Sequence, residues 1–135
     1  MGLSVGEFRK LIEKANGGKS APSEHDLQVT CVNLFRAKHY EHAHLLFAIP
    51  NGGYRCKRTA SMMRAEGQQS GVPDLFLAVA RHGYHGLWIE MKNGKAGRVS
   101  KEQKEMMEVL EEQGYKCEVC RSVEDFDNVT DTYLQ

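Results

Sequence analysis

Two apolar segments joined by a short turn decide the fold: Pro73-Asp74-Leu75-Phe76-Leu77-Ala78-Val79-Ala80 and Gly86-Leu87-Trp88-Ile89-Glu90-Met91-Lys92. The five residues between them include Gly83 and have the length of a hairpin turn, which predicts two antiparallel strands. Such a hairpin places the start of the first strand beside the end of the second, and therefore Asp74 beside Glu90. Because side chains two residues apart on a strand leave the same face, Lys92 is expected on the face of Glu90.

Patterns on either side of this hairpin complete an α-β-(α)-β-β-α-β-α order. Helices are predicted from residue 4 to the stop at 16–18, over 23–40, 57–66 and 100–113, and from 122 onward; the other strands are predicted at 44–49 and 115–121. The core stripes are predicted from helical spacing, with Leu27, Cys31, Leu34 and Phe35 on the second helix and Gln103, Met106, Met107 and Leu110 on the fourth. A hairpin followed by a strand–helix–strand crossover predicts an α/β fold with a mixed four-stranded sheet flanked by helices.

The length and composition of the chain are typical of one globular domain. Its 135 residues are 41% hydrophobic and 27% charged, enough for a sizeable core. A glycine-containing linker sets off the first helix, so we predict an N-terminal appendage at residues 1–22 and a main domain at 23–135. No run is long enough to cross a membrane, and the start lacks a signal-peptide pattern, so a cytoplasmic protein without a membrane partner is expected.

The zero net charge conceals an uneven distribution along the chain. Residues 55–104 hold ten Lys and Arg against four Asp and Glu, whereas residues 105–135 hold two against nine. The basic third contains the predicted hairpin, and a local positive surface around acidic residues is what polyanion binding requires. The alternative is chance clustering of charges on solvated faces.

The four cysteines and six histidines show no pattern that predicts a metal site. Cys117 and Cys120 have the spacing of a zinc or redox pair, but they lie in a predicted strand, where positions three apart face opposite ways. Reduced thiols are therefore expected. No phosphate-binding glycine loop, nucleophile elbow or dinucleotide fingerprint is present, so no organic cofactor is expected.

The acids and the lysine of the hairpin indicate phosphodiester chemistry. Clustered carboxylates hold a divalent cation, and a nearby ammonium group stabilises the attacked phosphate. The alternative for Glu90 and Lys92 is a surface ion pair on an edge strand, which the additional presence of Asp74 makes the less favoured interpretation.

Five motifs together resemble one nuclease family. They are the helix-borne Glu24, Ile49-Pro50-Asn51-Gly52-Gly53, Gly71-Val72-Pro73-Asp74, Trp88-Ile89-Glu90-Met91-Lys92 and Ser100-x-x-Gln103. Over about residues 23–121 the chain resembles the virus-type replication-repair nuclease (VRR-NUC) domain of the PD-(D/E)XK superfamily, and the resemblance implies a restriction-endonuclease-like core.

The resemblance also implies roles for these residues. Asp74, Glu90 and the Met91 carbonyl would bind Mg²⁺ or Mn²⁺, and Lys92 would position or deprotonate the attacking water. Glu24 would bind a second metal ion directly or through water, although a charge in the first turn of a helix explains Glu24 equally well. Gln103 would join the site, although a helix-capping role is physically sufficient for it.

DNA is the implied partner. The resemblance implies a homodimeric DNA-repair endonuclease of a bacterium or a phage-infected host cell that cuts branched DNA, such as four-way junctions or flaps. Candidate DNA-binding residues are Asn51, Gly52, Gly53, Arg55, Lys57, Arg58, Lys95, Arg98 and Lys101. A restriction-like duplex nuclease and a non-catalytic nucleic-acid-binding module remain the alternatives.

Overall fold

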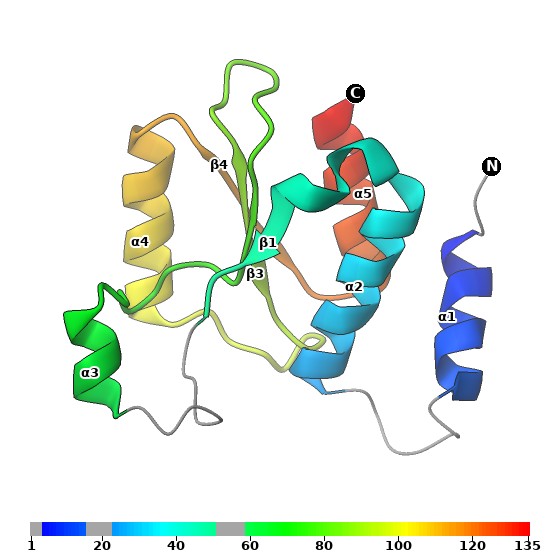
Figure 1. Ribbon diagram of the computed structural model, residues 1–135, viewed down its shortest axis with the longest axis horizontal. Coiled ribbons are helices and arrows are strands. Elements are labelled where there is room, and N and C mark those ends of the chain that lie inside the picture. Colours follow the sequence, from blue (N-terminus) through cyan, green and yellow to red (C-terminus); the bar gives the residue numbers. More distant parts are fainter. Residues whose placement is uncertain (1–3, 16–22, 51–58) are drawn as a thin grey trace.

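A computed structural model shows a four-stranded sheet with helices on both faces (Figure 1). It describes residues 4–15, 23–50 and 59–135. The strands, in their order across the sheet, are β1 (Leu46–Ala48), β2 (Leu75–Leu77), β3 (Leu87–Met91) and β4 (Lys116–Cys120). The β1–β2 and β2–β3 pairs are antiparallel and the β3–β4 pair is parallel. The predicted mixed α/β sheet is therefore confirmed.

The helices form unequal layers on the two faces of this sheet. They are α1 (Val5–Ala15), α2 (Glu24–Lys38), the 3-10 helix η1 (Tyr40–Leu45), α3 (Ala60–Ala65), α4 (Lys101–Glu112) and α5 (Val123–Leu134). α2 and α5 lie on one face and α4 lies on the other, while α1 packs outside α2 and α5 (Figure 1). No helix of the described part is long and apolar enough to cross a membrane.

Polar side chains fix the starts of the two helices that frame the site, as the sequence predicts. Ser23 caps α2 in a reciprocal capping box with Asp26, and Ser100 caps α4 in the same way with Gln103. Each pair satisfies backbone N–H groups that the first helical turn leaves without a carbonyl partner. The starting points of both helices are therefore set locally.

The core lies between the sheet and the α2–α5 layer. Alternate strand residues such as Leu75, Leu77 and Ile89 are fully buried there, against Phe35 of α2 and Phe126 of α5. The predicted α2 stripe of Leu27, Cys31, Leu34 and Phe35 is buried and thus confirmed. The first helix reaches the same core in the same chain, because Val5 and Phe8 pack against it.

The opposite face of the sheet is less buried than the sequence predicts. Met106, Met107 and Leu110 of α4 are half-buried, and no α4 residue is fully buried. The prediction of a closed core stripe on α4 is therefore wrong in degree. A single helix covers this face, and the polar side chains of Glu90 and Lys92 occupy part of it.

Several predicted boundaries are also wrong. Residues 44 and 45 belong to η1 rather than to a strand, so β1 is three residues long, and α2 ends at Lys38 rather than at Tyr40. β2 ends at Leu77 although the apolar run continues to Ala80. The chain leaves the sheet there to form a tight turn at His82 and Gly83, both of which have positive φ. A short apolar segment does not by itself show how many of its residues pair with a neighbouring strand.

Candidate active site

The hairpin register brings Asp74 and Glu90 into contact. Leu75 of β2 pairs with Ile89 of β3, so the residues just outside this pair also lie opposite each other. The two side chains lie close enough for Asp74 to raise the pKa of the Glu90 carboxyl through hydrogen bonding and charge. Asp74 Oδ2 also accepts a hydrogen bond of 2.8 Å from the backbone N–H of Met91. The two carboxyl groups that the sequence places side by side are therefore adjacent in the structure.

Glu90 is buried to an unusual degree for a carboxylate. Glu90 is 1% exposed, and the pKa of its carboxyl is raised to about 9, mainly by this burial. Hydrogen bonding to Asp74 and the charge of Asp74 also raise the pKa, whereas the charge of Lys92 lowers it. A buried carboxyl beside a second one avoids two negative charges by keeping a proton. A cation bound between them would remove the need for that proton.

Lys92 faces the same space, as strand alternation predicts. Its side chain is 12% exposed, and its Nζ lies 4.0 Å from Glu90 Oε2. That distance is an ion pair and too long for a hydrogen bond, so the ammonium protons remain available to another acceptor. A Cβ at Gly97 would lie 3.0 Å from the Cβ of Lys92, so the loop packs directly on the lysine stem.

The loop over Lys92 is itself fastened to the next strand. The guanidinium of Arg121, just after β4, donates to the carbonyl oxygens of Gly94 (2.9 Å) and Gly97 (2.5 Å). The backbone N–H of Gly94 donates back to the Arg121 carbonyl. Arg121 is not among the residues that sequence reasoning singles out, because its two acceptors are backbone atoms that no sequence motif reports.

Gln103 caps α4 and also contacts Glu90. Its Oε1 accepts a hydrogen bond from the backbone N–H of Ser100 (2.9 Å), and its Nε2 donates to both carboxyl oxygens of Glu90 (each 3.2 Å). The capping bond fixes the orientation of the amide, because only the oxygen can accept from Ser100. The capping box of α4 thereby aims an N–H donor at Glu90.

A close backbone contact explains why residue 71, at the start of the segment before Asp74, is a glycine. Its φ is +84°, and a Cβ there would lie 2.6 Å from the carbonyl oxygen of Glu102 in the first turn of α4. No side chain fits into this contact, because the obstructing atom is backbone. The loop that leads to Asp74 therefore rests on the same helix start that carries Gln103.

The remaining predicted site residues are less closely engaged. Glu24 is exposed in the first turn of α2, and its negative charge adds to the rise of the Glu90 pKa. Lys95, Arg98 and Lys101 are exposed, and Lys101 forms an ion pair with Glu105 (3.8 Å). The other candidates for DNA contacts lie outside the described residues: Asn51, Gly52, Gly53, Arg55, Lys57 and Arg58.

The two cysteines of the Cys-x-x-Cys pair point to opposite faces, which confirms the argument from strand geometry. Cys117 Sγ donates to the Met107 carbonyl of α4 (3.7 Å), whereas Cys120 is fully buried in the α2–α5 core with Cys31. Burial raises the pKa of the Cys117 thiol to about 12. Protonated sulfurs on different faces cannot share a zinc ion.

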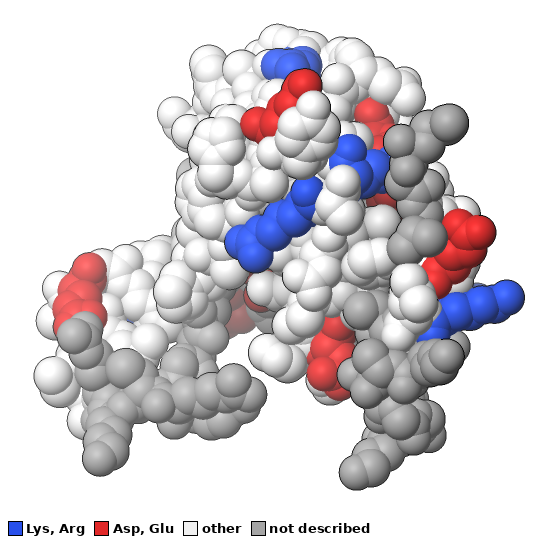
Figure 2. Space-filling model, turned by 45° about the vertical axis from the view of Figure 1, so that its right-hand side comes forward, with Lys and Arg blue, Asp and Glu red and all other residues white. Residues whose placement is uncertain are grey.

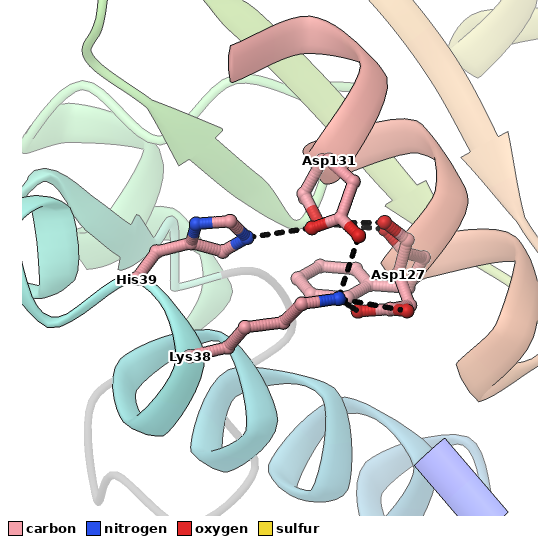
Figure 3. A network of polar contacts seen from close by, with 6 residues as sticks. Lys38, His39, Asp127 and Asp131 are labelled. Atoms are coloured by element: carbon pink, nitrogen blue, oxygen red, sulfur yellow. Dashed lines mark hydrogen bonds and ion pairs between the residues drawn. The ribbon is translucent and has the colours of Figure 1, made fainter. Parts of the chain in front are cut away.

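A second polar cluster joins the end of α2 to α5 (Figure 3). Lys38 Nζ bonds to Asp127 (3.0 Å) and Asp131 (2.6 Å), and His39 Nε2 lies 2.7 Å from Asp131. Burial lowers the pKa of Lys38, but the hydrogen bonds to Asp131 and Asp127 outweigh it and raise the pKa overall. The lysine pairs with both carboxylates, so this cluster is a brace between helices.

The charge of one side of the molecule is mixed. Figure 2 shows the face reached by bringing the right-hand side of Figure 1 forward, where Lys and Arg side chains alternate with Asp and Glu among the residues drawn in colour. A polyanion needs a surface dominated by one sign. This face therefore offers no extended basic surface formed by the described residues.

Comparison with known proteins identifies the kind of domain. The family model of the VRR-NUC domain matches residues 23–124. A solved structure described as "VRR_NUC domain protein" superposes with a TM-score of 0.74 at 24% sequence identity, covering 86% of this chain and 91% of that chain. No curated protein matches the chain. The superposition supports the restriction-endonuclease-like core.

Proposed function

Because the chain belongs to the VRR-NUC domain family, which is of nuclease type, we propose that it is a divalent-metal-dependent DNA endonuclease. The observation that carries this proposal is the contact between Asp74 and Glu90 with the ammonium group of Lys92 4.0 Å away. A buried carboxyl beside a second acid and a lysine is costly to stability, and it is the arrangement that phosphodiester hydrolysis requires.

The residues present fit a hard divalent cation. The described part contains no group of three or more His, Cys, Asp and Glu side chains that could hold a metal ion, so Asp74 and Glu90 are the two acidic donors. Mg²⁺ is commonly held by one or two carboxylates, with water and substrate phosphate completing its shell. The raised pKa of Glu90 supports the assignment, since a bound cation would compensate the paired charge. Such an ion supplies polarisation of the phosphate and a lowered pKa for water.

The protein side chains would then divide the remaining work. Lys92 would orient the attacking water through its free ammonium protons and stabilise the additional negative charge on the phosphate. Gln103 would hold the Glu90 carboxylate in one orientation through two hydrogen bonds. Asp74 is held by the Met91 N–H, so both acids are positioned before any ligand arrives.

We further propose that branched DNA, such as a four-way junction or a flap, is the preferred substrate of a homodimer. The described residues provide one acid pair per chain, and paired cuts on two strands require two such sites. Shape and backbone charge, rather than base reading, would provide the selectivity.

Cleavage of a panel of DNA structures tests this function. The purified protein is incubated with a four-way junction, a flap, single-stranded DNA and linear duplex of shared sequence, each with Mn²⁺, Mg²⁺ or EDTA. We expect junction or flap cleavage roughly tenfold or more faster than duplex cleavage, and none in EDTA. Equal cutting of linear duplex would favour a restriction-like nuclease. Failure to cut any substrate with either metal, while DNA is still bound, would show a non-catalytic binding module.

A further inference from the structure

A polar cavity of about 320 Å³ lies beside the acid pair, between α3, the loop before β2 and α4. Its lining residues are Arg64, Gln68, Gln69, Ser70, Gly71, Val72 and Gln103. We propose, on the premise of the nuclease function above, that this cavity binds a phosphate of the DNA strand next to the phosphate that is cut.

The lining of the cavity has the chemistry of an anion site. It contains one cation and several amide and hydroxyl donors, and no carboxylate is among its residues. The exposed guanidinium of Arg64 forms no hydrogen bond or ion pair with any residue that the structure describes, and its planar fork of N–H donors matches the geometry of a phosphate. Glu66, Asp74 and Glu102, the nearest acids in the sequence, do not line the cavity.

The amides of the cavity wall have spare donors. Gln68 Nε2 makes one long hydrogen bond of 3.4 Å to the Pro50 carbonyl, and its second N–H has no partner among the described residues. Gln69 and Ser70 are exposed on the loop. About half or more of protein–DNA hydrogen bonds go to phosphate and sugar, and Gln and Ser side chains are among the donors that make them.

Gln103 connects the cavity to the site. It lines the cavity, and its Nε2 donates to both carboxyl oxygens of Glu90, so one side chain separates the two spaces. The contact between Gly71 and the first turn of α4 fixes the loop against the same helix start. A strand whose phosphate lies at the acid pair can therefore place a neighbouring phosphate in this cavity.

Other cavities of the described part fit a phosphate less well. The cavity beside the Lys38 cluster is lined by Glu41 and Asp131, and the one beside Tyr84 is lined by Glu118. Carboxylates at these positions would repel a phosphate. A smaller cavity of about 200 Å³ on α2 includes Arg36 and no acid, but its lining contains no residue that is hydrogen-bonded to Asp74 or Glu90.

Binding measurements on Arg64 variants test the proposal separately from catalysis. In an Asp74→Asn background with Mg²⁺, fluorescence anisotropy gives the Kd for a labelled four-way junction as a function of salt. Arg64→Ala is expected to weaken binding roughly 3- to 10-fold and to reduce the salt slope by about 1. The Kd of the Arg64→Lys variant should lie between that of the Asp74→Asn protein and that of the same protein carrying Arg64→Ala. Arg36→Ala removes the same charge from an exposed position near the C-terminal end of α2. It should leave the Kd within about twofold of that of the Asp74→Asn protein.

A neutral methylphosphonate placed at each phosphate near the branch point in turn locates the contact. One position should weaken binding by the Asp74→Asn protein and have no further effect once Arg64→Ala is present. An Arg64→Ala variant that binds DNA as tightly as Arg36→Ala would overturn the proposed phosphate site. So would a scan in which the effect of every methylphosphonate adds to that of Arg64→Ala. In the protein with Asp74 intact, Arg64→Ala should raise KM for cleavage without lowering kcat. Absence of all cleavage would instead count against the nuclease proposal. The binding measurements would still decide whether the cavity binds a DNA phosphate.

Discussion

Asp74→Asn should reduce DNA cleavage by about 10²- to 10³-fold while leaving the fold intact. The carbonyl oxygen of Asn can still accept the hydrogen bond from the Met91 N–H, so no buried donor is left without a partner. What the substitution removes is the charge that, with Glu90, would bind the cation. The measurement is the single-turnover rate of junction cleavage in Mn²⁺, with thermal unfolding as a check on folding.

Lys92→Met should produce a comparable loss by a different route. Methionine retains much of the stem that packs against Gly97 and lacks the ammonium group beside Glu90. Asp131→Asn and Lys116→Met are the matched controls, because they make the same chemical changes in the Lys38 cluster and at the Lys116–Glu118 ion pair. The controls should cut at nearly the wild-type rate. Full activity of either site variant would remove its residue from the catalytic site.

The second large effect concerns stability against pH in the metal-free protein. Glu90 has a pKa of about 9 in the folded chain, far above the ordinary value of 4.5. Between these values the folded state binds more protons than the unfolded state, so the free energy of unfolding decreases as pH rises from about 4.5 to about 9. Glu90→Gln removes this dependence, because an amide does not ionise there. In EDTA at pH 8.5, we expect the variant to unfold roughly 4 °C or more above the wild type.

The sign of the pH effect provides an internal control. At pH 4.5 the Glu90 carboxyl is protonated in both states, so the advantage of Glu90→Gln should disappear or reverse, since glutamine has one oxygen fewer to accept from Gln103. Glu118→Gln, which changes a half-exposed carboxylate paired with Lys116, serves as the matched comparison. A difference in unfolding temperature between the wild type and Glu90→Gln that stays constant across this pH range would show that ionisation of Glu90 does not destabilise the fold.

Local chemistry made part of this site predictable from the sequence. The hairpin determines which strand positions lie opposite each other, so Asp74 and Glu90 could be placed side by side, and strand alternation added Lys92. Serine followed three residues later by an acid or amide predicted the starts of α2 and α4. In each case the interacting residues are close in sequence or are joined by one short turn.

Contacts between distant segments could not be predicted in the same way. Local sequence predicts Gln103 only as a capping residue, and its place at the site came from the family resemblance, because its bonds to Glu90 depend on how α4 lies on the sheet. Arg121 bonds to carbonyls 24 and 27 residues away, and His39 meets Asp131 92 residues away. The 3-10 helix η1 was missed because its apolar residues also fit a strand pattern.

Crystals of the protein soaked in Mn²⁺ and measured by anomalous diffraction test the metal site most directly. An anomalous peak should lie within coordination distance of the carboxylates of both Asp74 and Glu90, and the Asp74→Asn protein should lose it under the same soak. Density that bridges neither carboxylate, or a peak that persists in Asp74→Asn, would contradict the metal-dependent mechanism.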